Sequence, residues 1–287
     1  MSQIRDFIYK RKKTSAFIII VLLFSLIGGI GFMIGNHLEV NRHSLVSEKI
    51  PAAFDNYKIV HLSDLHNESY GPNQQTLIHK VLAEDPDLIV ISGDSVDRYT
   101  GDWANSLTVL TELAKVKPVY FSTGNHEYWT SIHKDAAAIL AETGAVYLKN
   151  ESLWIEKDGQ QLSLSGIDDP WYFEEKGGFQ SMLLQMGQDL PKGFHILISH
   201  RPERQDQYVD AGFDLVFTGH AHGGQVRLPF TQGLIAPNQG FFPKLTTGLH
   251  EKSGKFLMIS RGLGNPLKYP RIFNAPEIIV LTLKSQP

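Results

Sequence analysis

The sequence predicts an α/β fold in which two β-sheets form a sandwich flanked by helices (αββα), preceded by one transmembrane helix. Three observations support this prediction. Short apolar runs typical of buried strands alternate with amphipathic segments typical of helices. A hairpin pattern interrupts this alternation in the middle of the chain. A long uncharged apolar run stands near the N-terminus of a chain whose 287 residues, 42% of them hydrophobic, can form one large core.

The apolar run predicts a membrane anchor at residues 16–35. Residues 16–34 carry no charge, and a spanning helix needs about 20 such residues. The run exceeds the about 7–15 apolar residues of a cleavable signal, and no Ala-x-Ala site follows it. The basic cluster 10–13 precedes it and has no counterpart after it, so residues 1–15 are expected in the cytoplasm. We therefore expect a single-pass protein of the cell membrane, with the residues after the anchor outside the cytoplasm. Gly31 and Gly35 have the spacing of closely packed helices.

The remaining chain is expected to consist of a polar linker, residues 36–55, which contains Pro51, and one domain, residues 56–287. Strands are expected where short apolar or β-branched runs end at glycine or polar residues. These runs are 57–62, 87–91, 119–121, 195–198, 215–217, 255–260 and 277–283. Residues 153–167 read as two strands around the turn Lys157-Asp158-Gly159.

Helices are expected between the strands at 76–84, 105–116, 131–142 and near 179–188. The first places Leu77, Val81 and Leu82 on one face, which is the spacing of an amphipathic helix. The third ends before Gly144, a residue suited to the left-handed backbone that follows many helices.

Five polar motifs follow five of the strands directly. They are Asp64-Leu65-His66, Gly93-Asp94-Ser95-Val96-Asp97, Gly124-Asn125-His126-Glu127, Ser199-His200 and Gly219-His220-Ala221-His222. Open α/β sheets bind ligands at the carboxyl ends of their strands. Two of the motifs hold donors two residues apart, and an extended backbone would aim such side chains the same way. Carboxylate, amide and imidazole groups are donors to divalent metals, so the pattern predicts a two-metal site.

Composition narrows the possible chemistry. The chain has no cysteine, which excludes disulfides, thiolate-zinc sites and a cysteine nucleophile. The first 15 residues carry five bases and one acid, a net +4 against −3 for the whole chain, so the remainder carries about −7. Such an acidic domain is not expected to bind nucleic acid, which requires a basic surface.

The ordered set Asp-x-His, Gly-Asp-x-x-Asp, Gly-Asn-His-Glu, His and Gly-His-x-His resembles the calcineurin-like metallophosphoesterases over roughly residues 57–284. Residues 219–225 and 260–264 resemble more narrowly a bacterial, membrane-associated subgroup of phosphodiesterases. Any one of these motifs is weak evidence, because Asp-x-His arises often by chance. Five of them in order, each at a strand end, make a strong resemblance.

The resemblance implies two divalent metal ions with Asp94 bridging them. One ion would be held by Asp64, His66, Asp94 and His222, and the other by Asp94, Asn125, His200 and His220. Two carboxylates leave two divalent ions with a positive charge that suits a phosphate ester. Four imidazoles argue against calcium or magnesium and leave manganese, iron or zinc. Such a pair would activate a shared water as hydroxide for in-line attack on phosphorus.

His126 would protonate the leaving oxygen or stabilise the transition state. Asp97 would orient a ligand or His126, or serve only as a turn residue. We expect Glu127 to be only a favourable acid at a helix start. Arg98 and Arg201 could touch the phosphate, although a solvated or ion-paired arginine is commoner. Trp171, with the aromatic residues after it, and Phe241-Phe242 either line the cleft or pack in the core.

The expected function is hydrolysis of a phosphodiester or pyrophosphate bond, of an envelope lipid or a cell-wall component, outside the cytoplasm. A phosphomonoesterase and a pyrophosphatase acting on a UDP-sugar-linked lipid are the alternatives among enzymes. A different class is a scaffold that retains the metal site and only binds its ligand. The sequence does not decide the oligomeric state.

Overall fold

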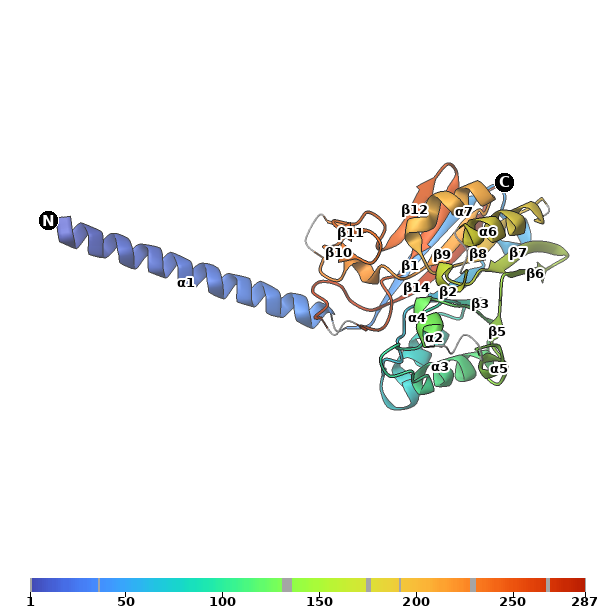
Figure 1. The fold of residues 1–287 in the computed structure, drawn as a ribbon, viewed down its shortest axis with the longest axis horizontal. Coiled ribbons are helices and arrows are strands. Elements are labelled where there is room, and N and C mark those ends of the chain that lie inside the picture. Colours follow the sequence, from blue (N-terminus) through green and yellow to red (C-terminus); the bar gives the residue numbers. More distant parts are fainter. Residues whose placement is uncertain are drawn as a thin grey trace.

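Two six-stranded sheets packed face to face form the centre of the molecule (Figure 1). The computed structural model describes residues 2–35, 37–130, 136–173, 177–190, 192–227, 231–266 and 269–286. Residues of both sheets share one apolar core, while two further cores lie between the sheets and the helices that cover them. The predicted αββα class is therefore confirmed.

The first sheet has the strand order β1-β14-β2-β3-β4-β5, and all neighbours are parallel except β14 and β2. Its strands are β1 (Glu39–Ser47), β14 (Glu277–Ser285), β2 (Lys58–Leu62), β3 (Leu88–Ser92), β4 (Val119–Ser122) and β5 (Val146–Tyr147). The central strands β2 and β3 are buried on both faces, which explains their continuous apolar sequences.

The second sheet has the order β12-β13-β9-β8-β7-β6, with a parallel centre and an antiparallel hairpin at each edge. Its strands are β12 (Gly248–Lys252), β13 (Lys255–Ile259), β9 (Leu215–Thr218), β8 (His195–Ile198), β7 (Gln160–Gly166) and β6 (Glu151–Lys157). The hairpin predicted around residues 157–159 is β6–β7. A small hairpin, β10 (Ile235–Ala236) and β11 (Gly240–Phe241), forms a separate two-stranded sheet.

Helices cover the outer faces of both sheets. Against the first sheet lie α2 (Gln75–Ala83), α3 (Ala104–Ala114) and α5 (Ala136–Ala141), and against the second lie α6 (Gly178–Gln188) and α7 (Gln205–Ala211). The short α4 (Asn125–Trp129) begins in the third motif. The helix predicted at 131–142 is observed only from residue 136, because residues 131–135 lie outside the described part of the chain.

The expected linker at 36–55 is wrong. Residues 39–47 form β1, which pairs with β14 along its whole length at the edge of the first sheet. Only Leu45 in this strand is buried, so the strand has no apolar run that could reveal it. Its partner β14 supplies the hydrogen-bonding edge, which the local sequence does not show.

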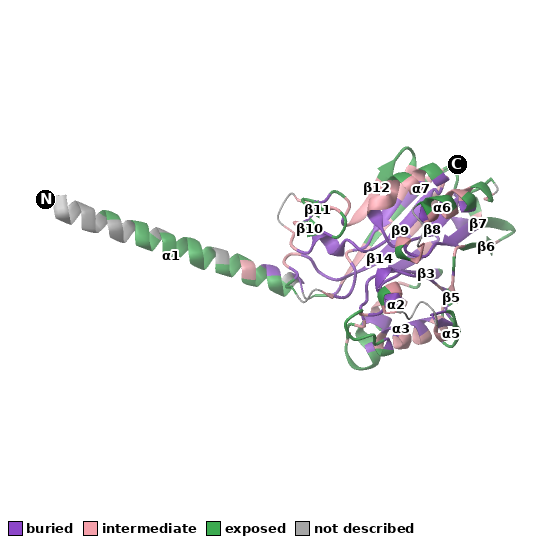
Figure 2. Ribbon diagram, viewed as in Figure 1, coloured by how far each residue is buried: buried purple, intermediate pink, exposed green. Residues whose placement is uncertain are grey.

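A long helix, α1 (Ser2–Gly35), precedes the domain and projects away from it (Figure 1). Its residues 13–33 are long and apolar enough to cross a membrane by length and composition, and only 6% of the most apolar window is buried (Figure 2). The helix does not end in a free tether, because Gly31 and Gly35 pack closely against residues 271–273 of the domain.

Candidate active site

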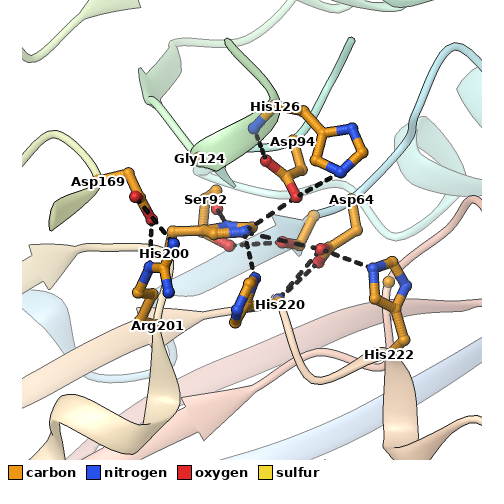
Figure 3. A network of polar contacts seen from close by, with 12 residues as sticks. Asp64, Ser92, Asp94, Gly124, His126, Asp169, His200, Arg201, His220 and His222 are labelled. Atoms are coloured by element: carbon orange, nitrogen blue, oxygen red, sulfur yellow. Dashed lines mark hydrogen bonds and ion pairs between the residues drawn. The ribbon is translucent and has the colours of Figure 1, made fainter. Parts of the chain in front are cut away.

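The five motifs meet at one end of the sandwich, between the two sheets (Figure 3). β2, β3 and β4 are parallel neighbours in the first sheet, and β8 and β9 are parallel neighbours in the second. Parallel strands end at the same sheet edge, so the loops after these strands are brought together. The topology therefore assembles side chains that lie up to 158 positions apart in the sequence, from Asp64 to His222.

Asp94 lies at the centre of this assembly. Its Oδ2 is 3.1 Å from His200 Nε2, 3.8 Å from His66 Nε2 and 4.0 Å from His126 Nε2. Its Oδ1 accepts a hydrogen bond of 2.8 Å from the backbone amide of His126. One carboxylate thus faces imidazoles from three loops, which is the position that a bridging ligand requires.

A second carboxylate, Asp64, lies beside it. Asp64 Oδ1 is 3.5 Å from His222 Nε2 and 3.9 Å from His66 Nε2, and both its oxygens accept from the backbone amide of His220. Three overlapping groups of buried side chains have donor atoms close enough to hold an ion. They are Asp64-His66-His222, His66-Asp94-His126 and Asp94-His200-His220.

The predicted ligands lie on an unusual backbone. Asp64, His66, Asp94, His220 and His222 all adopt positive φ angles, between 46° and 61°. The expectation that extended backbone aligns the paired donors is wrong, because each pair follows its strand in a left-handed loop. Such a conformation costs about 1–2 kcal/mol per residue, and strained backbone concentrates at functional sites.

Glycines allow the loops to approach one another. A Cβ atom on Gly219 would fall on Ser63 Oγ and Asp64 Oδ2, and a Cβ on Gly124 would fall on Asp94 Oδ1. Neither glycine has a positive φ, so the requirement is for space rather than for backbone freedom. The glycine in each of these motifs is therefore explained by a carboxylate packed against it.

Hydrogen bonds leave one free nitrogen on two of the imidazoles. His200 Nδ1 donates to the Ser92 carbonyl at 2.7 Å, and His220 Nε2 donates to Asn238 Oδ1 at 2.8 Å. The remaining nitrogens, His200 Nε2 and His220 Nδ1, face each other at 3.1 Å. A proton on His200 Nε2 bridges the two nitrogens at this distance, and a cation that both rings bind could take the place of that proton.

Two further groups fit bound metal ions. Both ring nitrogens of His66 and Oδ1 of Asn125 are buried without a hydrogen-bond partner among the described residues. Buried polar atoms are nearly always satisfied, so unpartnered ones call for an explanation such as an ion. The seven predicted ligands supply carboxylate, amide and imidazole donors, and this donor set fits two divalent cations.

The electrostatics of the site favour positive charge. Burial would lower the pKa of His200, but the carboxylates of Asp94 and Asp64 raise it to about 10. Burial lowers the pKa of His222 to about 3 and holds the pKa values of His66 and His220 well below their usual range. Neutral imidazoles with free lone pairs beside carboxylates are the state that a metal ion binds.

Glu127 is not only an acid at a helix start, as the sequence suggested, because its carboxylate also binds the loop that contains Asp94. Its carboxylate is fully buried and accepts from the backbone amides of Gly124 at 2.8 Å, Asp94 at 2.9 Å, Ser95 at 2.7 Å and Val96 at 3.3 Å. The first contact completes the N-terminal cap of α4, which the spacing from Gly124 could have indicated. The others hold the Asp94 loop, and no local pattern reveals them. Burial and the charge of Asp94 raise the pKa of Glu127 to about 7.

His126 is oriented by a backbone group rather than by Asp97. The amide of Arg98 donates to His126 Nδ1 at 3.1 Å, which places the ring proton on Nε2, the nitrogen that faces Asp94. The Asp97 carboxylate accepts instead from the amide of Tyr99 at 3.1 Å, as a turn residue does. Burial lowers the pKa of His126, against the charge of Asp94.

A cavity of about 270 Å³ opens over the ligands. Its walls include His126, Arg98 and Trp171, with Pro237 and Asn238 from the loop between β10 and β11. A second cavity of about 520 Å³ shares Trp171 and Asn238 with it. A cleft of this extent can hold more than a single phosphate group.

The three residues predicted from the sequence to contact substrate all line this cleft, but they differ in burial and in their partners. Arg201 is buried and paired with Asp169, with contacts of 2.7 and 3.1 Å, so the ion-paired alternative is the observed one. The guanidinium of Arg98 is exposed and stacks 4.7 Å from the Trp129 ring. Trp171 is 51% exposed, which excludes a core role for it.

Asn238 and Asp169 are the site residues that sequence reasoning missed. Asn238 Oδ1 contacts His220 and also accepts from Arg201 at 3.0 Å, and Asp169 fixes Arg201. Both lie in irregular loops outside the five motifs, so no spacing singles them out. Two other histidines left outside the motifs, His61 and His195, are buried and hydrogen-bonded to Ser92 and Ser163.

Comparisons with known proteins agree with this geometry. Residues 57–224 match the family of calcineurin-like phosphoesterases. The uncharacterized metallophosphoesterase YkuE of Bacillus subtilis is 30% identical over 256 residues, covering 86% of this chain and 86% of that protein. Phosphodiesterase YaeI of Escherichia coli is 29% identical over 266 residues, covering 89% and 93%. A transmembrane protein with metallophosphoesterase domain from Bos taurus is 28% identical over 264 residues, covering 83% and 55%.

The family match spans more than half of the chain and contains all five motifs. The first of these relatives aligns along most of its own length as well as along most of this chain. The chain therefore belongs to the calcineurin-like phosphoesterases, a family of dimetal enzymes that hydrolyse phosphoric esters.

Proposed function

We propose that this protein is a phosphodiesterase that holds two divalent metal ions and acts on a diester or pyrophosphate bond. Asp64, His66, Asp94 and His222 would hold one ion, and Asp94, Asn125, His200 and His220 the other. The observation that carries the proposal is the set of buried donor atoms without protein partners, on His66 and Asn125, around the Asp94 carboxylate. Such an arrangement costs stability unless cations occupy it.

The bound ions would supply a water nucleophile at neutral pH and stabilise charge on the phosphoryl oxygens. The four imidazole donors favour manganese, iron or zinc over calcium or magnesium, which prefer oxygen ligands. Side chains of the protein would supply the proton donor and the charges that surround the substrate.

His126 would act through its Nε2–H. Because the Arg98 amide donates to Nδ1, a proton on that nitrogen is disfavoured, and burial lowers the pKa of the ring further. The neutral ring keeps its Nε2 proton directed at the cavity, where it can donate to the oxygen of the leaving group. A neutral imidazole donor of this kind stabilises negative charge that develops in the transition state.

Charge at the cavity favours a diester over a monoester. A monoester carries one more negative charge, which would need a further cation nearby. The buried Arg201 is already neutralised by Asp169, and the remaining cation on the wall, Arg98, lies at the exposed rim. A pyrophosphate diester remains compatible, because its second phosphate could extend along the cleft to Arg98.

The apolar helix α1 supports a membrane location, with the basic residues before it in the cytoplasm and the domain outside. One relative carries the description of a transmembrane protein. A domain held at the outer surface would meet envelope lipids and cell-wall polymers, and we propose that the scissile diester or pyrophosphate belongs to one of these.

The test uses the full-length protein in detergent, stripped of metal and then reconstituted with manganese, iron or zinc. We expect about two ions per chain by elemental analysis and faster hydrolysis of bis(p-nitrophenyl) phosphate than of p-nitrophenyl phosphate. Faster hydrolysis of the monoester would instead favour a phosphomonoesterase. Two bound ions without hydrolysis of either ester would favour the ligand-binding scaffold.

A further inference from the structure

The junction between α1 and the domain leaves almost no distance between them. The apolar part of α1 extends to Met33, yet the Phe273 amide already donates to the Gly31 carbonyl at 2.9 Å. A Cβ atom on Gly31 would lie 2.7 Å from Ile272 Cγ2 and 2.8 Å from the Phe273 ring. The domain therefore contacts α1 within its apolar segment, at a level where that segment would still be among lipid headgroups.

A continuous backbone connection leads from this junction to the β10–β11 hairpin. Ile272 forms a bridge with Val226, the Leu234 amide donates to the Val226 carbonyl at 2.8 Å, and the Phe242 amide donates to the Leu234 carbonyl at 2.9 Å. Adjacent hydrogen-bonded segments lie about 5 Å apart, so the hairpin lies within about two such spacings of the junction. Figure 1 shows β10 and β11 beside the C-terminal end of α1.

This part of the domain exposes large apolar side chains, which we call the aromatic surface. Its members are Ile235 (42% exposed), Phe241 (70%), Phe242 (69%) and Tyr269 (66%). The expectation that Phe241 and Phe242 either line the cleft or pack in the core is not met, since both lie outside the two cavities and are largely exposed. Phe242 has a φ of 54°, an uncommon and costly conformation for a bulky residue.

Charge in the same region suits an anionic lipid surface. No aspartate or glutamate occurs in residues 215–250 or 252–276, although the chain contains 30 acidic residues. The hairpin region carries the exposed Lys244. Exposed aromatic rings on a segment that carries a basic side chain and no acidic residue are typical of surfaces that enter the membrane interface.

We propose that the aromatic surface enters the headgroup region of the bilayer beside α1, as a second membrane contact of this protein. The inference rests on α1 as the membrane span but does not depend on the reaction catalysed. Pro237 and Asn238, at the tip of the same hairpin, form part of the cavity wall. The contact therefore holds the opening of the catalytic cleft next to the lipid surface.

The absence of cysteine allows this contact to be tested in the full-length protein. An environment-sensitive fluorophore is attached to Phe242→Cys, and as a control to Trp154→Cys on β6, at the end of the domain away from α1 (Figure 1). The proteins are reconstituted into phosphatidylcholine–phosphatidylglycerol liposomes with and without nitroxide lipids. We expect a blue-shifted spectrum and quenching by shallow nitroxides at position 242, and a water-like, unquenched label at 154.

A second pair of variants tests whether the aromatic surface keeps the domain in contact with the bilayer. With the label on Tyr269→Cys, the changes Phe241→Gln and Phe242→Gln should abolish its quenching. The matched changes Val146→Gln and Trp154→Gln, which replace exposed apolar residues on β5 and β6, should leave it unchanged. Hydrolysis of a water-soluble diester in detergent should be equal in both double variants, which shows that the fold is retained.

Two outcomes would overturn the proposal. Water-like, unquenched labels at both 242 and 154 would show that the surface faces solvent. A blue shift at 242 that grows with protein density but ignores nitroxide lipids would show that a second copy of the chain covers it. Neither result would affect the proposed hydrolysis, which is measured separately on the soluble diester.

Discussion

The geometry of the site depends on the backbone conformation of single residues as much as on their side chains. Five of the seven proposed ligands have positive φ angles, and Glu127 holds the Asp94 loop with three of its four hydrogen bonds. Mutating a ligand therefore removes a donor and also releases local strain, so metal content is a more direct readout than stability.

Metal content should distinguish the bridging carboxylate from a ligand of one ion. Asp94→Ala should lose more metal than Asn125→Ala, because Asp94 faces both ligand groups while Asn125 offers one neutral oxygen. Elemental analysis should find about one ion per chain in Asn125→Ala and fewer in Asp94→Ala. Equal metal contents in Asp94→Ala and the unmodified protein would refute the bridging role.

The contribution of His126 should depend on the leaving group. His126→Ala should keep both ions and lose roughly 10²–10⁴-fold in kcat on esters with poor leaving groups. The loss should be smaller for a nitrophenolate, whose oxygen needs less stabilisation. A loss that is constant across leaving groups would assign the Nε2–H to a non-bridging phosphoryl oxygen instead.

The buried His61 should make the protein less stable in acid. Burial lowers its pKa from 6.5 to about 3, so the folded state excludes a proton that the unfolded state binds below about pH 6.5. Its contribution is fully present above that pH and falls by up to about 1.4 kcal/mol per pH unit between about 6.5 and 3. His61→Phe keeps a ring and should flatten the pH dependence of Tm in the metal-free protein. An unchanged slope would contradict the assignment.

At the scale of elements, the loops after the strands matter more than the strands themselves. β2, β3, β4, β8 and β9 were all expected from their apolar runs, and each is observed within a residue or two. The loops meet only because glycines let the backbone of one approach the carboxylate of another.

One added methyl group should therefore disable the site. Gly219→Ala places a Cβ on Asp64 Oδ2 and Ser63 Oγ, both buried, so the loops must move apart. Overpacking of this kind costs about 1–3 kcal/mol, and we expect metal binding and hydrolysis to fall together. Gly28→Ala is the matched control, because nothing lies near its Cβ in α1. Full activity in Gly219→Ala would show that the contact is easily relieved.

At the scale of the whole molecule, the C-terminal end of α1 is packed against the domain. Gly31 and Gly35 do have the spacing of a packing face, and the partner is the 271–273 segment of the domain. Because β1 begins at Glu39, only three residues separate it from the end of α1. The short connection and the packing of α1 leave no flexible tether between them, so a membrane-inserted α1 would hold the domain close to the bilayer.

The charges around α1 predict the membrane topology. The C-terminus lies in the domain, away from α1 (Figure 1), so a reporter fused there should be active outside the cytoplasm. Alkaline phosphatase, which is active only outside, should therefore give activity. Fluorescence from a C-terminal fusion that matures only in the cytoplasm would reverse the predicted orientation.

The local sequence was sufficient for the αββα class, the helices near 76–84 and 179–188, and the family, because apolar periodicity and ordered motifs are local properties. It was not sufficient for β1, which pairs through a distant strand, or for Asn238 and Asp169, which enter the site from irregular loops.

The seven proposed ligands could be named from the sequence, but their arrangement could not. Spacing alone suggested extended pairs, whereas tertiary packing bends both pairs into left-handed loops around Asp94. Likewise, the sequence showed an apolar helix, and only the fold placed its Gly31 against Phe273 and its C-terminal end beside the β10–β11 hairpin. Composition and periodicity determine which groups are present. The close approach of segments distant in the sequence decides which of them meet.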